Sequence, residues 1–179
     1  MNEKQEKIIE YIKKYRLFLP FGVYLILQLL AVVVGKLTNL TLRSIPKIFL
    51  FWMAVITSML LILGISRKIL KWGCEKGLKG VPVIKKIWYV VLGIVASGVI
   101  YIGFAVSAFM YQPEHIVVHN GVRMVASVNS FLQETVYYYE YENIFFRGSE
   151  MIGYEDYGNG SRDPLKDGNR EPIHQYFDE

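Results

Sequence analysis

Three long stretches of this chain carry almost no charge. They cover residues 17–35, 48–66 and 87–111, and charged segments separate them. An α-helix needs about 20 mostly apolar residues to cross the hydrocarbon core of a bilayer. One such stretch is compatible with a buried helix of a soluble protein, but a chain of 179 residues has too little other sequence to cover three. The pattern predicts an integral membrane protein with three transmembrane α-helices.

The pattern changes after the third stretch. Asn120-Gly121 is a strong signal for a two-residue β-hairpin turn, because both residues tolerate a positive φ. On the second arm of the hairpin, apolar residues occupy every other position: Val122, Met124, Ala126 and Val128. This period of two indicates a strand with one apolar face. We expect a small antiparallel β-rich domain over residues 112–158, followed by an acidic polar tail over residues 159–179.

The stretch TVYYYEYENIFF, residues 135–146, holds four tyrosines and two phenylalanines. As a strand it would point alternate tyrosines to one face: Tyr137, Tyr139 and Tyr141. We expect this set to pack on the apolar face of the hairpin. Tyr138, Glu140 and Glu142 would then lie on the opposite face, in contact with water, where they are candidates for docking a partner. A helix over the same residues is the alternative, but consecutive tyrosines favour a strand.

The distribution of basic residues predicts the orientation in the membrane. Residues 1–16 include five Lys and Arg residues, and seven lie between the second and third stretches, against three between the first and second. Cytoplasmic segments carry an excess of Lys and Arg. We therefore expect a multi-pass protein of the cell membrane, with residues 1–16 in the cytoplasm and the C-terminal domain outside. Because sixteen mostly charged and polar residues come before the first span, we expect that span to be an uncleaved anchor.

The net charge of +4 combines two opposite parts. From residue 112 onward the chain has twelve acidic and five basic residues, whereas the segments before it are basic. These basic residues are dispersed beside the predicted helix ends, where they suit anionic lipid headgroups. We expect the lipid bilayer, and not nucleic acid, to be their partner.

The three predicted spans contain no Asp, Glu, Lys, Arg or His. Ion-coupled carriers place ionisable groups in the membrane, so this composition argues against an independent transporter. The third span carries small residues at helical spacing: Gly93, Ser97, Gly98, Gly103 and Ser107. Small residues four apart let helix backbones approach closely. We expect this surface to pack either against the other two spans or against a partner protein.

Catalytic motifs do not stand out in the sequence. It has no nucleophile elbow, no HExxH and no phosphate-binding glycine loop. The tail carries oxygen-bearing side chains, Asp163, Asp167, Asn169 and Glu171, but their spacing differs from that of a calcium-binding EF-hand. We expect a solvated tail, and neither a metal nor a cofactor.

The combination of YYYEY, YGNG and DP between Tyr137 and Pro164 resembles a group of small Gram-positive bacterial membrane proteins with no assigned function. The resemblance implies no mechanism. The function expected from the residues is therefore that of a non-enzymatic membrane protein whose outer domain recognises another membrane or envelope protein. A small accessory subunit of a transport or export complex is the alternative.

Overall fold

The computed structural model describes residues 15–77, 80–166 and 170–177. The chain forms two compact units. The first comprises the described residues up to Leu29 together with Phe49–Ser107, and it is helical. The second comprises Leu30–Ile48 and the described residues from Ala108 onward, and it contains the strands together with the adjoining ends of the helices.

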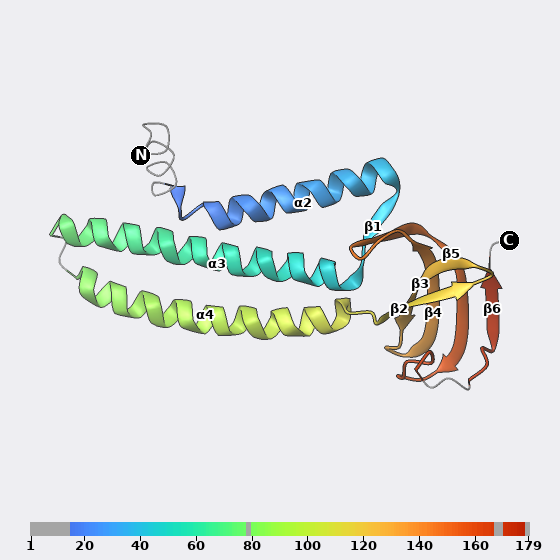
Figure 1. The fold of residues 1–179 in the computed structure, drawn as a ribbon. Coiled ribbons are helices and arrows are strands. Elements are labelled where there is room, and N and C mark those ends of the chain that lie inside the picture. Colours follow the sequence, from blue (N-terminus) through green and yellow to red (C-terminus); the bar gives the residue numbers. More distant parts are fainter. Residues whose placement is uncertain (1–14, 78–79, 167–169, 178–179) are drawn as a thin grey trace, which may run out of the picture. The chain divides into compact units, whose positions relative to one another are not determined.

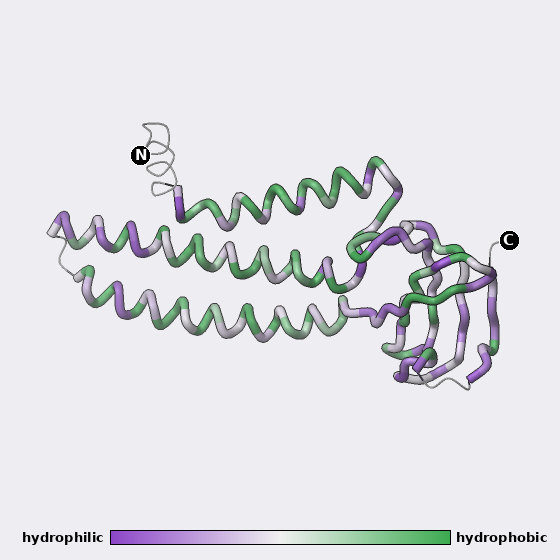
Figure 2. The backbone as a smooth tube through the Cα atoms, viewed as in Figure 1, coloured by the Kyte–Doolittle hydropathy of each residue, from purple (hydrophilic) through white to green (hydrophobic). Residues whose placement is uncertain are grey.

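Within the described residues, three helices are long and apolar enough to cross a membrane (Figure 1). They are α2 (Leu19–Thr38), α3 (Ser44–Glu75) and α4 (Val81–Met110). Hydrophobic residues predominate along all three (Figure 2). At most 6% of the most apolar segment of each helix is buried, so most of their apolar side chains are exposed. The prediction of three long apolar helices followed by an antiparallel sheet is confirmed.

Helices α3 and α4 extend beyond the predicted spans into the basic segment between them. Lys and Arg are good helix formers, so α3 continues nine residues past Ser66 to Glu75. Gly77 follows the end of α3 with a φ of 67°, a left-handed conformation that suits a residue just after a helix. Gly80, with a φ of 92°, directly precedes α4. Most of the predicted basic loop is therefore helical.

The described strands form one antiparallel sheet. They are β1 (Leu40–Leu42), β2 (Glu114–His119), β3 (Val122–Asn129), β4 (Gln133–Tyr141), β5 (Phe146–Asn159) and β6 (His174–Phe177). Their order is β1-β5-β4-β3-β2, and β6 also pairs with β5. Strand β1 lies in the segment between the first two helices, and β6 lies in the predicted polar tail. That tail is therefore partly a strand of the sheet.

The predicted hairpin is present. Strands β2 and β3 pair from Glu114 opposite Ser127 to His119 opposite Val122. The turn residues Asn120 and Gly121 have φ values of 49° and 81°, as a two-residue hairpin turn requires.

The sheet curls around a single apolar core. Alternate residues of β3 pack in this core with side chains from β4 and β5: Met124, Ala126, Val128, Val136, Tyr138 and Tyr157. Strands β2 and β6 stand far apart in the strand order, yet the rings of His119 and Phe177 stack with centroids 4.4 Å apart. The sheet therefore has the form of a half-barrel, and we call its core side the inner face and the opposite side the outer face.

The two faces of β4 are the reverse of the prediction. Val136 lies opposite Val128, and Tyr138 lies opposite Ala126, so Tyr138 is in the core and is 5% exposed. The expected core tyrosines 137, 139 and 141 lie on the outer face. The physical reason is the register between β3 and β4, because a shift of one residue exchanges the two faces of a strand.

Candidate functional site

A row of tyrosines crosses three neighbouring strands on the outer face. Tyr137 of β4 lies opposite Tyr154 of β5, and Tyr154 lies opposite Tyr176 of β6. The rings of Tyr154 and Tyr176 have their centroids 6.2 Å apart. Tyr137 and Tyr154 are partly exposed, and Tyr176 is 51% exposed. We call these three residues the tyrosine row. Tyrosine suits contact surfaces because a large, rigid ring and a polar hydroxyl are presented together.

The other two outer-face tyrosines hold arginines. The guanidinium of Arg147 stacks over the ring of Tyr139, 3.7 Å from its centroid, and that of Arg123 stands 4.4 Å over the ring of Tyr141. Cation–π contacts of this kind contribute about 0.5–2 kcal/mol, depending on how far water is excluded. Arg147 is buried and Arg123 is exposed, so the first contact is the stronger. Tyr139 and Tyr141 are thus engaged within the domain.

Tyr138 has a structural role in place of the predicted docking role. Its hydroxyl donates to Glu155 Oε2 at 2.6 Å, and the hydroxyl of Tyr157 donates to the same oxygen at 2.8 Å. Burial raises the pKa of Tyr138 and of Tyr157 well above the usual value, and the hydrogen bonds to Glu155 raise both further. Both hydroxyls therefore remain protonated donors. The predicted exposure of Tyr138 is wrong, because its side chain fills the core.

Glu140 and Glu142 are both exposed, as expected. They lie at and just after the end of β4, which ends at Tyr141. Glu140 lies opposite Met124 and therefore on the same face of β4 as Tyr138, but at the exposed end of the strand, whereas Glu142 follows the strand. In the described part of the chain, neither carboxylate forms a hydrogen bond or an ion pair with the tyrosine row.

Glu134 is an important residue that sequence reasoning missed. It is 1% exposed, its Oε1 accepts the backbone N–H of Arg162 at 2.8 Å, and its Oε2 accepts from the guanidinium of Arg170. The hydrogen bond from Arg162 and the charge of Arg170 lower the pKa of Glu134 despite its desolvation. The contacts of Glu134 connect the segment before β6 to the start of β4. Both partners lie in the predicted tail, so no local pattern around Glu134 indicates the contact.

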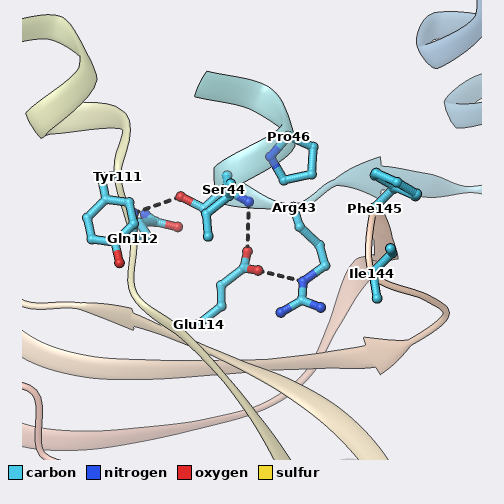
Figure 3. Close-up of a pocket in the computed structure, with 9 residues that line it drawn as sticks. Arg43, Ser44, Pro46, Tyr111, Gln112, Glu114, Ile144 and Phe145 are labelled. Atoms are coloured by element: carbon cyan, nitrogen blue, oxygen red, sulfur yellow. Dashed lines mark hydrogen bonds and ion pairs between the residues drawn. The ribbon is translucent and has the colours of Figure 1, made fainter. Parts of the chain in front are cut away.

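A polar cluster joins the turn before α3 to the turn after α4 (Figure 3). Glu114 at the start of β2 accepts the Nε–H of Arg43 at 2.7 Å and the backbone N–H of Ser44 at 3.0 Å. Glu114 therefore caps the N-terminus of α3, where a negative charge is favourable. The Ser44 hydroxyl accepts the N–H of Gln112 at 2.9 Å and lies 3.4 Å from the carbonyl oxygen of Met110. These contacts hold the start of α3 and the end of α4 at one level.

A cavity of about 310 Å³ lies beside this cluster (Figure 3). Polar groups of Arg43, Ser44, Gln112 and Glu114 line one part of it. The rest of the lining comes from Ile45, Pro46, Tyr111, Ile144 and Phe145. Because Glu114 already engages Arg43 and the α3 N-terminus, the charges in the cavity compensate one another. The arrangement joins the ends of two helices to the sheet.

Asp163 interacts with two basic side chains. His115 Nε2 lies 2.7 Å from Asp163 Oδ2, and Lys166 Nζ lies 3.8 Å from the same oxygen. Among the described residues, no group of three or more His, Cys, Asp or Glu side chains is placed to hold a metal ion. Asp167 and Asn169, which belong to the oxygen-rich part of the tail, lie outside the described residues.

The predicted small-residue surface of α4 divides into two parts. Near its C-terminal end, the Nε1–H of Trp52 donates to Ser107 Oγ at 2.9 Å, and a Cβ on Gly103 would stand 3.0 Å from the Trp52 ring. This part packs within the chain. At Gly93 and Gly98, by contrast, no described atom of another element lies within 4 Å of the position of a Cβ.

Gly93 also lines an apolar groove of about 330 Å³ between α3 and α4. Ser97 donates its hydroxyl to the carbonyl oxygen of Gly93 at 2.9 Å and is thus satisfied within its own helix. Gly93, Ser97 and Gly98 therefore form the part of the predicted surface that is open for a neighbour.

Neither a known protein family, nor a curated protein, nor a solved structure matches this chain.

Proposed function

We propose that this chain is an integral protein of the cell membrane whose β domain stands outside the cell and recognises a protein partner. Two features support the placement. The helices α2, α3 and α4 expose apolar side chains over nearly their whole length. The basic residues gather in residues 1–16 and near the α3–α4 connection, which by the positive-inside rule belong in the cytoplasm.

The tyrosine row is the observation on which the recognition role rests. It brings three tyrosines from three strands into one line on the outer face. The core of the half-barrel consists of other residues, on the inner face. Tyrosine is enriched in protein–protein interfaces, whereas a surface tyrosine adds little to the stability of a domain. The role is non-enzymatic, with another membrane or envelope protein as the partner.

Site-specific photo-crosslinking in living cells tests this proposal. A benzophenone amino acid is placed at Tyr176 or Tyr154, and at Val122 as a matched control, since Val122 is 49% exposed and lies outside the row. We expect a discrete crosslinked product from the two row positions and none from Val122. Equal crosslinking at all three positions, or none at any, would mean that the row is not a recognition surface.

A second role is favoured by the open part of the α4 surface. No other described element lies within 4 Å of a Cβ at Gly93 or Gly98, Ser97 is exposed, and the groove at Gly93 is apolar. A helix from another membrane protein could pack there, as it would on an accessory subunit of a transport or export complex. This surface and the tyrosine row lie in different units, so both roles can be tested separately.

Substitutions at the glycines of the spans test this second role. Gly93→Leu and Gly98→Leu fill the open surface and should abolish co-purification of a membrane partner in mild detergent. Gly22→Leu in α2 is the matched control, because the Cβ of residue 22 also meets no described neighbour within 4 Å. Unchanged co-purification in the α4 variants would remove this role.

A further inference from the structure

Two loops of the β domain present large apolar side chains to the surroundings. Phe131 and Leu132 connect β3 to β4, and Ile144 and Phe145 connect β4 to β5. All four side chains are more than half exposed. Single exposed apolar residues are common on protein surfaces and need no explanation. Two adjacent pairs, at the two ends of the same strand, do call for one.

Each loop is fixed to the end of a different membrane helix. The ring of Phe131 packs edge-on against that of Phe109, with centroids 5.4 Å apart, one residue before the end of α4. The carbonyl oxygen of Phe145 accepts the N–H of Arg43 at 2.9 Å, one residue before the start of α3. The cluster at Glu114 holds these two helix ends at one level. Both loops therefore lie at the depth where the two helices leave the apolar layer.

The exposed apolar surface is continuous from the helix ends to these loops. Ile45 in the first turn of α3, Phe109 in the last turn of α4, and Tyr111 directly after α4 are all at least half exposed. Ile45 and Tyr111 line the same cavity as Ile144 and Phe145. This apolar surface runs from the helix ends onto the sheet.

The backbone of the second loop is suited to an environment poor in water. Asn143 Oδ1 accepts the N–H groups of Phe145 and Phe146 at 2.8 and 2.9 Å, and the N–H of Asn143 donates to the carbonyl oxygen of Phe146 at 3.1 Å. Where water is scarce, backbone polar groups need internal partners. The loop therefore provides partners for these three N–H groups itself, while the side chains of Ile144 and Phe145 are exposed.

From these observations we infer that the loops at Phe131–Leu132 and Ile144–Phe145 insert into the outer leaflet, at the boundary between headgroups and acyl chains. Interfacial segments of this kind lie about 5–10 Å deep. Insertion at both ends of β4 would hold the sheet against the bilayer and fix the direction of the tyrosine row. This inference rests on the proposed membrane insertion of the helices.

Fluorescence quenching in vesicles tests the inference with the full-length protein. Single cysteines carrying an environment-sensitive fluorophore are introduced in a Cys74→Ser background by Leu132→Cys and Phe145→Cys. Val118→Cys is the matched control in the same domain, because Val118 is also mostly exposed. Ile62→Cys in α3 reports whether the helices are inserted. The vesicles are phosphatidylcholine with a nitroxide lipid labelled near the top of the acyl chain, and iodide is the aqueous quencher.

The inference predicts several-fold stronger quenching by the nitroxide lipid, and weaker quenching by iodide, at Leu132 and Phe145 than at Val118. If the Ile62 probe is in lipid while both loop probes behave like Val118, loop insertion is wrong although the helices span the membrane. If the Ile62 probe is also in water, the proposed membrane insertion fails as well. If the loop probes lose their protection from iodide when the protein is diluted with lipid, a second copy of the chain covers the loops, and not the bilayer.

Discussion

Strand β4 carries tyrosines on both faces of the sheet, and the two faces use them differently. On the inner face, Tyr138 is enclosed by the core, and its hydroxyl is committed to Glu155. On the outer face, Tyr137 belongs to a partly exposed row that continues through Tyr154 to Tyr176. Residues of one type, adjacent in sequence, thus serve the core on one face, and we propose that they serve recognition on the other.

The largest expected effect is the loss of the inner tyrosine. Tyr138→Ala opens a cavity in the core and leaves Glu155 with one hydroxyl donor fewer, and large aromatic-to-Ala changes cost about 3–5 kcal/mol. Tyr154→Ala on the outer face removes cross-strand contacts worth about 0.2–1 kcal/mol each. Limited proteolysis of the domain, with increasing denaturant, measures both. Equal loss at the two positions would contradict the assignment of the faces.

The next effect concerns the buried carboxylate at the start of β4. Its folded pKa is lowered, so Glu134 contributes stability that is present above the unfolded pKa of about 4.3 and is lost as the pH falls through the folded value. Glu134→Gln should therefore destabilise the domain at neutral pH, by about 1–3 kcal/mol. The free energy of unfolding should also fall less steeply at acid pH in this variant than in the parent protein. A variant whose stability still falls as steeply below that pH would show that another group is responsible.

A smaller effect is expected from the hydroxyl of Tyr138 alone. Tyr138→Phe keeps the ring in the core and removes one hydrogen bond to Glu155, at a cost of about 1 kcal/mol. The folded pKa of Tyr138 is raised, so its stabilising contribution is present below the unfolded pKa of about 10 and is lost as the pH rises through the folded value. Ultraviolet titration of the tyrosines should show one late-ionising group fewer in Tyr138→Phe. Loss of a tyrosine that ionises in the ordinary range, with every late-ionising group retained, would place Tyr138 outside the core.

The smallest effect on stability, and the largest on partner binding, is expected at the edge of the tyrosine row. Tyr176→Ser removes a half-exposed ring and its cross-strand contact with Tyr154, so the free energy of unfolding should fall by about 0.2–1 kcal/mol. Crosslinking from a probe at Tyr154 should nevertheless weaken, because the ring of Tyr176 lies beside it. If crosslinking from Tyr154 is unchanged, partner recognition does not depend on the tyrosine row.

Much of the architecture follows from short-range patterns in the sequence. The three helices follow from apolar length, and the hairpin follows from Asn120-Gly121 and the alternation on β3. Strand β1 does not, because it has three residues and its partner Phe146–Gly148 lies about a hundred residues away. Strand β6 lies in a segment whose polar composition favours a loop. Both depend on pairing that no local signal records.

The faces of β4 show where pattern reading stops. Alternation at Tyr137–Tyr141 correctly predicts a strand with two distinct faces, but it does not say which face meets the core. That depends on the register with β3, which places Tyr138 opposite Ala126. The small residues of α4 show the same limit. Their spacing predicts a packing surface, but the partner at Gly103 and Ser107 is Trp52 of α3, which only the fold brings there.

Cysteine labelling of intact cells tests the central claim most directly, because it reports side and face together. In a Cys74→Ser background, a membrane-impermeant maleimide is applied to Tyr154→Cys and Tyr138→Cys in the domain, and to Lys71→Cys near the C-terminal end of α3, which we propose to lie in the cytoplasm. The account predicts that Tyr154→Cys is labelled at once, Tyr138→Cys only after the domain is unfolded, and Lys71→Cys only after the cells are broken. Labelling of Lys71→Cys in intact cells would reverse the orientation. Rapid labelling of Tyr138→Cys, with protection of Tyr154→Cys, would reverse the two faces of β4 and remove the recognition surface.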